Sequence, residues 1–90
     1  MPKYTVLLES QPEKYYRRVP TPIVKALKAC FAHLEENPKY HLSKIKRLQG
    51  YENLYRYRVG ELRVVYEIHE AKREVAVVAI LPRGDIYKKF

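Results

Sequence analysis

The chain has 90 residues, and 18 lysines and arginines against 10 aspartates and glutamates give it a formal net charge of +8. This length predicts one domain over residues 1–90 and excludes a doubly wound nucleotide-binding domain or a barrel with a deep cleft. With 47% hydrophobic residues the chain can build a core. The basic excess favours a polyanionic partner such as nucleic acid, an acidic protein or an anionic surface.

Cysteine content and hydropathy narrow the class further. A single cysteine, Cys30, excludes an internal disulfide and a cysteine-cluster metal site, and it fits a reducing cytoplasm, where we expect the protein to reside. We expect no membrane partner, because no basic-then-apolar signal begins the chain and no apolar run approaches the roughly 20 residues of a membrane span. The nine tyrosines are expected mainly to pack in the core and sheet, although their rings can also stack on nucleobases.

The start of the chain predicts a strand and then a short helix. Lys3–Glu9 is short and rich in β-forming residues, which predicts a strand. Ser10 and Glu13 have the spacing of a capping box, so a short helix is expected over Gln11–Arg18. Pro20 ends it.

A second helix follows directly. Thr21 and Pro22 are its expected cap and first residue, and Asn37-Pro38 stops it. One apolar stripe recurs at helical spacing, made by Ile23, Leu27, Cys30 or Phe31, and Leu34. The two helices should therefore form a hairpin over roughly Gln11–Glu36.

The second half of the chain predicts a β-meander. Residues 39–50 are polar and basic and read as a loop that can include a short strand. Beyond them the pattern has the period of two that is typical of strands, with a two-residue turn at Gly60-Glu61. Strands are expected at 54–59, Leu62–Ile68 and Glu74–Leu81, with a turn at His69–Arg73 and a break at Pro82-Arg83-Gly84. The order β-α-α-β-β-β predicts an α+β fold, in which the two-helix hairpin packs on a small antiparallel sheet and the first strand lies beside a member of the meander.

The hairpin turn fixes which side chains share a face. It pairs Val59 with Leu62, Arg58 with Arg63, Tyr57 with Val64, and Arg56 with Val65. The face toward the helices is expected to hold Tyr55, Tyr57, Val59, Leu62, Val64, Tyr66 and Ile68. The opposite face is expected to hold Arg56, Arg58, Arg63, Val65 and Glu67.

The arginine face has two interpretations. Like charges directly opposite in a sheet are destabilising, so a sequence selected only for folding would place an acid in this register. The structural interpretation is a solvated face with Glu61 and Glu67 as counterions. The functional interpretation is a phosphate site, because guanidinium groups match phosphate oxygens bidentately.

These residues resemble the RelE/ParE toxin superfamily, in particular its RelE branch and the archaeal-type members with Pro-Arg-Gly near the C-terminus. The resemblance spans almost the whole chain and includes the helical hairpin and its Asn-Pro stop. Its motifs are Leu48-Gln49-Gly50, the pattern Tyr-Arg-x-Arg-x-Gly-x-x-Arg-x-x-Tyr over Tyr55–Tyr66, Val77–Ile80, and Pro82-Arg83-Gly84-Asp85-Ile86-Tyr87.

The resemblance implies a microbial ribonuclease-type fold and a cytoplasmic toxin of a type II toxin–antitoxin pair. RelE-type members enter the ribosomal A site and cut mRNA by attack of a ribose 2′-hydroxyl on the adjacent phosphate, without a metal or other cofactor. The implied partners are the ribosome, mRNA and an acidic RelB-like antitoxin that forms a neutralised hetero-oligomer with the toxin. The antitoxin is expected to cover the basic face or to move the C-terminal tail.

The resemblance also implies roles for single residues. Arg63 matches the phosphate-stabilising arginine, Arg83 the second catalytic arginine, and Tyr87 the tyrosine that stacks on or orients the mRNA. Arg56 stands where RelE has a catalytic lysine. Arg58 matches a further basic position on the same strand.

Some positions depart from the family. Leu54 replaces the other strand lysine, and Lys46 stands where the YoeB-like branch has a glutamate. Arg56 is a poor base because a guanidinium keeps its proton. Either the ribosome activates the 2′-hydroxyl while Arg56 stabilises charge, which we favour, or the proton goes to Glu61, Glu67 or Tyr87.

Further basic residues are candidates for contact with RNA or the ribosome: Lys44, Lys46, Arg47, Lys88 and Lys89, together with Arg58. His33, His41 and His69 are expected to be solvated, with His41 able to touch RNA, and Cys30 to be a packed core thiol. Two other functions stay open, a ParE-like inhibitor of DNA gyrase and a catalytically silent relative that binds an antitoxin. The set of Arg56, Arg63, Arg83 and Tyr87 favours the nuclease.

Overall fold

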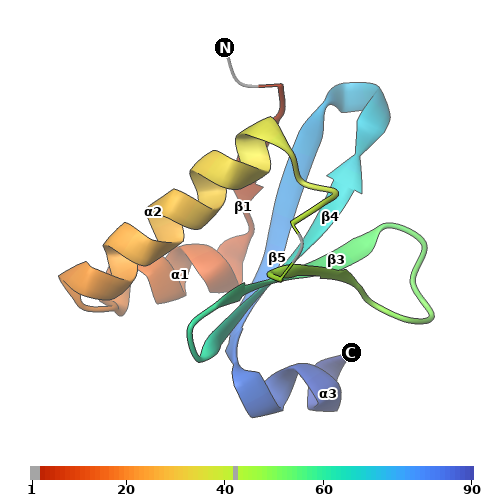
Figure 1. Ribbon diagram of the computed structural model, residues 1–90. Helices are drawn as coiled ribbons and strands as arrows, with labels where there is room; N and C mark the ends of the chain where they lie inside the picture. Colours follow the sequence, from red (N-terminus) through yellow and green to blue (C-terminus); the bar gives the residue numbers. More distant parts are fainter. Residues whose placement is uncertain (1–2, 42) are drawn as a thin grey trace.

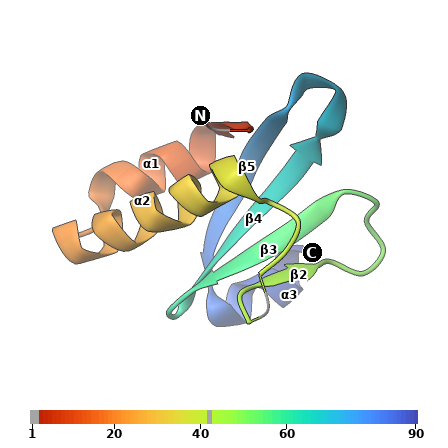
Figure 2. The same ribbon diagram turned by 45° about the horizontal axis from the view of Figure 1, so that its top comes forward.

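A five-stranded sheet carries the long helices on one face and a short C-terminal helix on the other (Figures 1 and 2). The computed structural model describes residues 3–41 and 43–90, apart from the side chain of Tyr87. In chain order the elements are β1 (Thr5–Leu8), α1 (Ser10–Arg18), α2 (Thr21–Glu36), β2 (Ile45–Arg47), β3 (Leu54–Val59), β4 (Leu62–His69), η1 (Glu70–Lys72), β5 (Glu74–Pro82), η2 (Arg83–Asp85) and α3 (Ile86–Lys89). The predicted α+β class is confirmed.

The sheet is mixed, whereas a wholly antiparallel sheet was predicted. Its strand order is β1-β5-β4-β3-β2, and β1 pairs in parallel with β5 while the other pairs are antiparallel. The alternation of side chains shows which residues of a strand face the core, but the same alternation is found in parallel and antiparallel strands. The direction of β1 therefore could not be predicted from its pattern.

Both long helices begin one residue earlier than predicted. Glu9 and Pro20 occupy the N-cap positions of α1 and α2, and neither makes a side-chain cap hydrogen bond. The capping box predicted for Ser10 is wrong. The Glu13 carboxylate instead accepts a 2.7 Å hydrogen bond from Arg17, one turn later on α1.

The predicted register of the β3–β4 hairpin is confirmed in every pair, including Arg58 opposite Arg63. Gly60 begins the turn with φ of 56°, which a glycine adopts without steric cost. The main core lies where the sheet meets the helices. Its buried members include Leu27, Cys30 and Leu34 of α2 and Tyr57, Val64, Tyr66, Ile68, Val75, Val77 and Ile80 of the sheet.

The opposite face is less open than predicted, because the C-terminal tail folds back on it. After the predicted break at Pro82-Arg83-Gly84, η2 and α3 bring Ile86 onto the sheet, where it is 2% exposed. A second buried cluster results, made by Leu54, Val65, Ala79, Leu81 and Ile86, with Leu48, Val78 and Phe90 partly buried around it. None of the helices in the described part of the chain is long and apolar enough to span a membrane.

Candidate functional site

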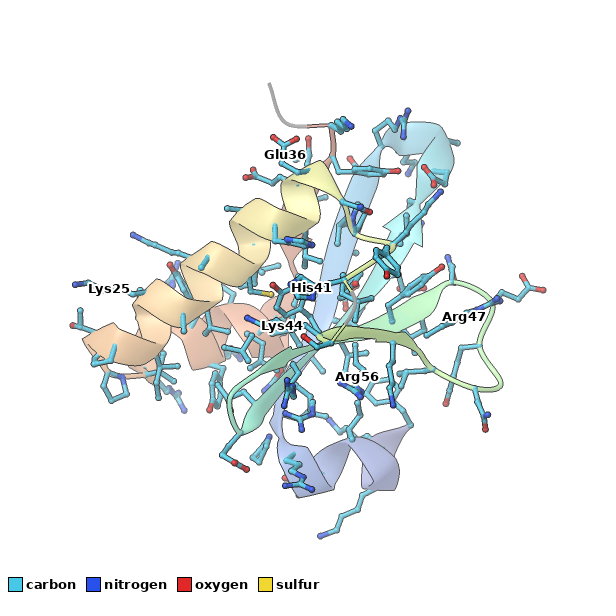
Figure 3. All side chains as sticks on the ribbon, viewed as in Figure 1. Lys25, Glu36, His41, Lys44, Arg47 and Arg56 are labelled. Atoms are coloured by element: carbon cyan, nitrogen blue, oxygen red, sulfur yellow. The ribbon has the colours of Figure 1, made fainter. Side chains whose placement is uncertain are left out.

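Basic residues occupy neighbouring registered positions on the sheet face that α3 partly covers. Arg58 lies directly opposite Arg63 in the β3–β4 pair, and Lys46 lies opposite Arg56 in the β2–β3 pair. Figure 3 shows Arg56 on the side of the sheet toward α3. The predicted convergence of Arg56, Arg58 and Arg63 is therefore present, and β2 adds a fourth cation to it.

The guanidinium of Arg63 is held over the hairpin turn. Its Nη1 donates 2.9 Å hydrogen bonds to the backbone carbonyls of Gly60 and Leu62. Burial lowers the pKa of Arg63 below its ordinary value, and the positive charges of Arg56, Arg83 and Arg58 lower it further, while Glu61 opposes the shift. An arginine keeps its proton even so, and Arg63 is therefore a fixed cation in the field of like charges.

Arg83 reaches this cluster through the backbone. Leu62 pairs with Pro82 at the end of the sheet, and the Arg83 N–H donates a 2.8 Å hydrogen bond to the Glu61 carbonyl. The exposed side chain of Arg83 thus starts beside the β3–β4 turn. This position explains why its charge acts on Arg63, from which it is separated by 20 positions in sequence.

Arg56 lines a groove beside the cluster. The groove has a volume of about 570 Å³, and its walls are Lys46, Arg47, Leu48, Gln49, Arg56 and Phe90. Within the described residues, Nη1 of Arg56 is buried and has no hydrogen-bond partner. A buried donor without a partner costs free energy, which a bound anion would recover.

Among the described residues, no salt bridge joins an acidic side chain to this cluster, although Glu61 acts on the charge of Arg63. In the described ranges, the salt bridges join Arg17 to Glu13, Lys39 and Arg73 to Glu70, and Lys88 to Asp85. None of them includes an arginine of the cluster. The same residues contain no group of three or more His, Cys, Asp or Glu side chains able to hold a metal ion.

Comparison with known proteins decides the family. A family described as "ParE toxin of type II toxin-antitoxin system, parDE" matches residues 3–87. The chain belongs to the RelE/ParE toxin superfamily. It is thus a toxin of the type II toxin–antitoxin class. No curated protein matches it significantly.

Solved structures of the superfamily share the fold of this toxin. The archaeal RelE–RelB complex from Pyrococcus horikoshii OT3 is 25% identical with a TM-score of 0.80, over 91% of this chain and 97% of that chain. The RelB–RelE complex from Methanococcus jannaschii is 28% identical with a TM-score of 0.72, over 93% and 98%. The isolated E. coli RelE toxin, at 20% identity, TM-score 0.76 and coverage of 96% and 93%, supports the fold alone.

Of the remaining basic residues predicted to bind RNA, Arg47 lines the groove at Arg56, and the others lie elsewhere on the toxin. Lys44 lies on the helix side of the sheet, with its Nζ 6.0 Å from the centre of the Tyr57 ring (Figure 3). Arg47 is paired with Tyr55, and Lys88 and Lys89 are exposed on α3. Tyr87 belongs to α3, but its side chain lies outside the described part of the structure, so its predicted role stays a prediction.

Sequence reasoning missed several residues of the toxin. Gln49 and Phe90 line the groove at Arg56, although neither carries a charge that would have drawn attention to it. His33 and His41 are partly buried and not solvated as predicted, because their rings pack 5.1 Å apart against Tyr57.

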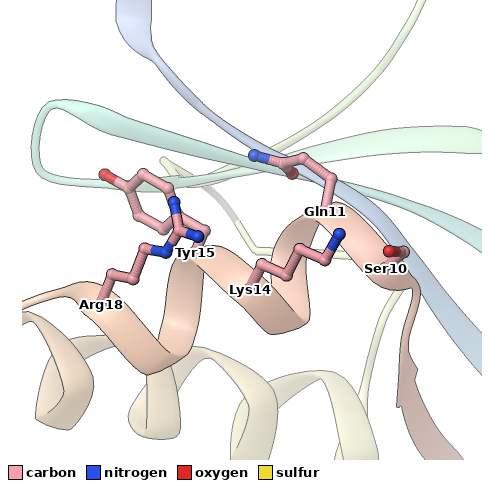
Figure 4. Close-up of a pocket in the computed structure, with 5 residues that line it drawn as sticks. All are labelled: Ser10, Gln11, Lys14, Tyr15 and Arg18. Atoms are coloured by element: carbon pink, nitrogen blue, oxygen red, sulfur yellow. The ribbon is translucent and has the colours of Figure 1, made fainter.

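Another hollow, of about 420 Å³, lies on α1 (Figure 4) and is lined by Ser10, Gln11, Lys14, Tyr15 and Arg18. It contains none of the predicted site residues. Gln11 in this hollow makes a structural contact, because its side-chain amide bonds both the N–H and the carbonyl of Ile80.

Proposed function

We propose that this toxin is a metal-independent, ribosome-dependent endoribonuclease that cuts mRNA in the A site. The observation that carries the proposal is the gathering of Arg56, Arg58, Arg63 and Arg83 around one hairpin, with no salt bridge to any of them among the described residues. A fold maintains opposed like charges at a cost in stability. A phosphodiester substrate would repay that cost, because its transition state concentrates negative charge on the non-bridging oxygens.

The reaction assigned to the site is attack of a ribose 2′-oxygen on the adjacent phosphorus. The bond from 2′-oxygen to phosphorus forms as the bond from phosphorus to the 5′-oxygen breaks, leaving a cyclic phosphate and a 5′-hydroxyl. Arg63 and Arg83 would stabilise the charge on the phosphate oxygens, with Arg56 beside them. The proton of the 2′-hydroxyl must be accepted by another group, since a guanidinium remains protonated.

We assign activation of the 2′-hydroxyl to the geometry of the ribosomal complex and not to a base of the toxin. The toxin offers two carboxylates near the cluster. Glu61 acts on the charge of Arg63, whereas Glu67 lies opposite Leu54 in the register. A toxin that depends on the ribosome in this way would cut free RNA very slowly, and Glu61→Gln and Glu67→Gln variants would keep their activity on the ribosome.

The experiment that tests the function is primer extension on mRNA from cells that express the toxin. We expect cuts inside translated codons with the wild type, and no cuts with Arg83→Ala. The Arg83→Ala variant should still fold, because the backbone N–H that binds Glu61 is retained.

The second candidate function is inhibition of DNA gyrase, which the match to the ParE family favours. The same cells distinguish the two functions. DNA breaks with intact mRNA would reject the nuclease and support the gyrase inhibitor. Intact mRNA and intact DNA, with antitoxin binding retained, would indicate a silent relative.

We further propose that an acidic, RelB-like antitoxin neutralises this toxin in a hetero-oligomer. The formal charge of +8 supports an acidic partner, and the similar chains from P. horikoshii and M. jannaschii were solved as complexes with RelB. Co-expression with the acidic product of an adjacent reading frame should restore growth and give a stable complex. Growth arrest with no complex would count against this partner.

A further inference from the structure

We propose that Gln11 of α1 is a positioning residue for Arg83, on which it acts through the end of β5. The inference rests on the proposed cleavage, in which Arg83 stabilises the charge of the phosphate, but the contacts that carry it belong to the fold. Figure 4 shows Gln11 on the first turn of α1, with its side chain directed toward β5.

The side chain of Gln11 takes the place of a strand at the edge of β5. β1 ends at Leu8 opposite Val77, and the Glu9 N–H donates a 2.9 Å hydrogen bond to the Val77 carbonyl. Three residues further along β5, Oε1 of Gln11 accepts a 2.9 Å hydrogen bond from the Ile80 N–H, and Nε2 donates one of 3.1 Å to the Ile80 carbonyl. Since Ile80 is fully buried, both of its backbone groups need such a partner.

This contact follows an irregularity in β5. The β4–β5 register shifts between Val65 and Tyr66, and Val78 is the extra residue on β5. A bulge bends its strand and disrupts the ladder locally. The pairing before the bulge therefore does not determine the direction in which β5 continues. Gln11 bonds Ile80 two residues after the bulge, and it fixes the strand at that point.

The segment that comes next carries Arg83. Leu81 is opposite Arg63 in the β4–β5 pair, and it is followed by Pro82, which has no N–H to donate. The Arg83 N–H then donates a 2.8 Å hydrogen bond to a carbonyl in the β3–β4 turn. The placement of Arg83 relative to Arg63 therefore depends on the position of β5, which Gln11 fixes from the opposite edge.

A small displacement of Arg83 is enough to slow the proposed reaction. A misplacement of about 1 Å can cost ~10²-fold in rate. Loss of the bonds to Ile80 leaves β5 paired with β4, so we expect a smaller displacement and a loss of about tenfold. The loss should appear in the rate of bond cleavage and not in affinity for the ribosome, because α1 covers the face of the sheet away from the arginine cluster.

The first test follows the backbone amide signals of the folded toxin by NMR. Gln11→Met keeps the length of the side chain but removes both hydrogen bonds. We expect the Ile80 and Arg83 amide protons to move upfield as their hydrogen bonds lengthen, whereas Ile68 near the far end of β4 keeps its signal. An unchanged Arg83 signal, or a change of equal size at Ile68, would overturn the proposal. The matched control is Lys14→Met, on the next turn of α1.

The second test is a double-mutant cycle on single-turnover cleavage in a reconstituted translation system. Gln11→Met should lower the rate at saturating toxin about tenfold, with unchanged affinity for the ribosome. In an Arg83→Ala background the same change should lower the slow residual rate less than about twofold, because no side chain is left to misplace. An equal loss in both backgrounds would show a role independent of Arg83 and would overturn the proposal. Lys14→Met should cut at the wild-type rate.

Together the tests separate this proposal from the proposed function. If the Arg83 amide signal moves as expected but the wild type cuts no mRNA, the nuclease fails, whereas the placement of Arg83 by Gln11 stands. If the wild type cuts mRNA and Gln11→Met cuts it equally fast, the positioning role fails and the nuclease stands.

Discussion

Arg63 differs in its surroundings from the basic residues that form ion pairs. Arg17, Lys39 and Arg73 each have a carboxylate within salt-bridge distance. Arg63 instead donates to two backbone carbonyls, and the charges of other arginines act on it, opposed by Glu61 without a salt bridge. Ion pairs on an exposed surface contribute little to stability, but an unpaired cluster remains available for a ligand.

The hydroxyl of Tyr66 stabilises the fold through one buried hydrogen bond. It donates a 2.7 Å hydrogen bond to the carbonyl of Pro38, and both residues are buried. Tyr66→Phe leaves that carbonyl without its partner, which should cost about 1–3 kcal/mol in the free energy of unfolding. Urea denaturation measures the change. Tyr55→Phe is the control, since Tyr55 stacks on Tyr66 but is only partly buried, and a loss of equal size there would contradict the explanation.

The hydrogen bonds of the Glu70 carboxylate should make the stability of the fold depend on pH. Lys39 and Tyr4 hold the pKa of Glu70 below its ordinary value of 4.5 by hydrogen bonding to the carboxylate. The ionised carboxylate therefore stabilises the fold above pH 4.5, and this contribution is lost as the pH falls through the lower pKa of the folded state.

We expect Glu70→Gln to unfold at lower urea concentration than the wild type at neutral pH. The gap should close as the medium becomes acidic, because both side chains are then neutral. Glu52→Gln, in an exposed loop, should show no such gap. A gap that persists at the lowest pH at which both proteins fold would refute the ionic origin of the effect.

The β3–β4 hairpin is the element in which stability and function oppose each other. Arg58 and Arg63 are directly opposite, and an opposite-charge pair in that register would be favourable by about 0.2–1 kcal/mol. Arg58→Glu should therefore raise the midpoint of thermal unfolding while it weakens mRNA cleavage. Arg58→Gln should be intermediate in stability. A decrease in stability for both variants would show that the arginine pair is not under electrostatic strain.

Beyond the end of β1, a side chain of α1 bonds the edge of β5 that faces away from β4. β1 stops at Leu8, opposite Val77, and the Gln11 side chain then binds the N–H and carbonyl of Ile80 at 2.9 and 3.1 Å. Gln11→Ala should cost about 1–3 kcal/mol and should speed amide hydrogen exchange at Ile80. Lys14→Ala, on the next turn of α1, is the control. Unchanged protection of the Ile80 amide in Gln11→Ala would contradict this role.

The sequence pattern predicted those elements that are determined by neighbouring residues. Gly60 and the alternation around it determine the register of the hairpin, so the opposition of Arg58 and Arg63 could be derived from the sequence. Ile86 is buried in a cluster with Leu54 and Val65, which lie far earlier in the sequence. Because this burial is not a local property, the tail was not predicted to fold as α3. Leu54 shows the same limit, since it is buried beneath that helix.

At the scale of the whole molecule, only part of the net charge of +8 belongs to the candidate site. The sequence predicted the arginines of β3 and β4, and the family resemblance added Arg83, which only the pairing of the last strand brings near Arg63. The groove at Arg56 could not be predicted, because it requires β2, the loop after it and the C-terminal Phe90 to meet.

The central claim is that the arginine cluster cuts mRNA on the ribosome, and the most direct test is cleavage of a reporter mRNA in a reconstituted translation system. We predict that the wild type cuts inside codons and leaves cyclic phosphate ends. Arg63→Ala should cut about 10²–10³ times more slowly, as expected when one preorganised donor to the developing charge is removed. Uncut mRNA with the wild type, or equal rates for the wild type and Arg63→Ala, would contradict the claim.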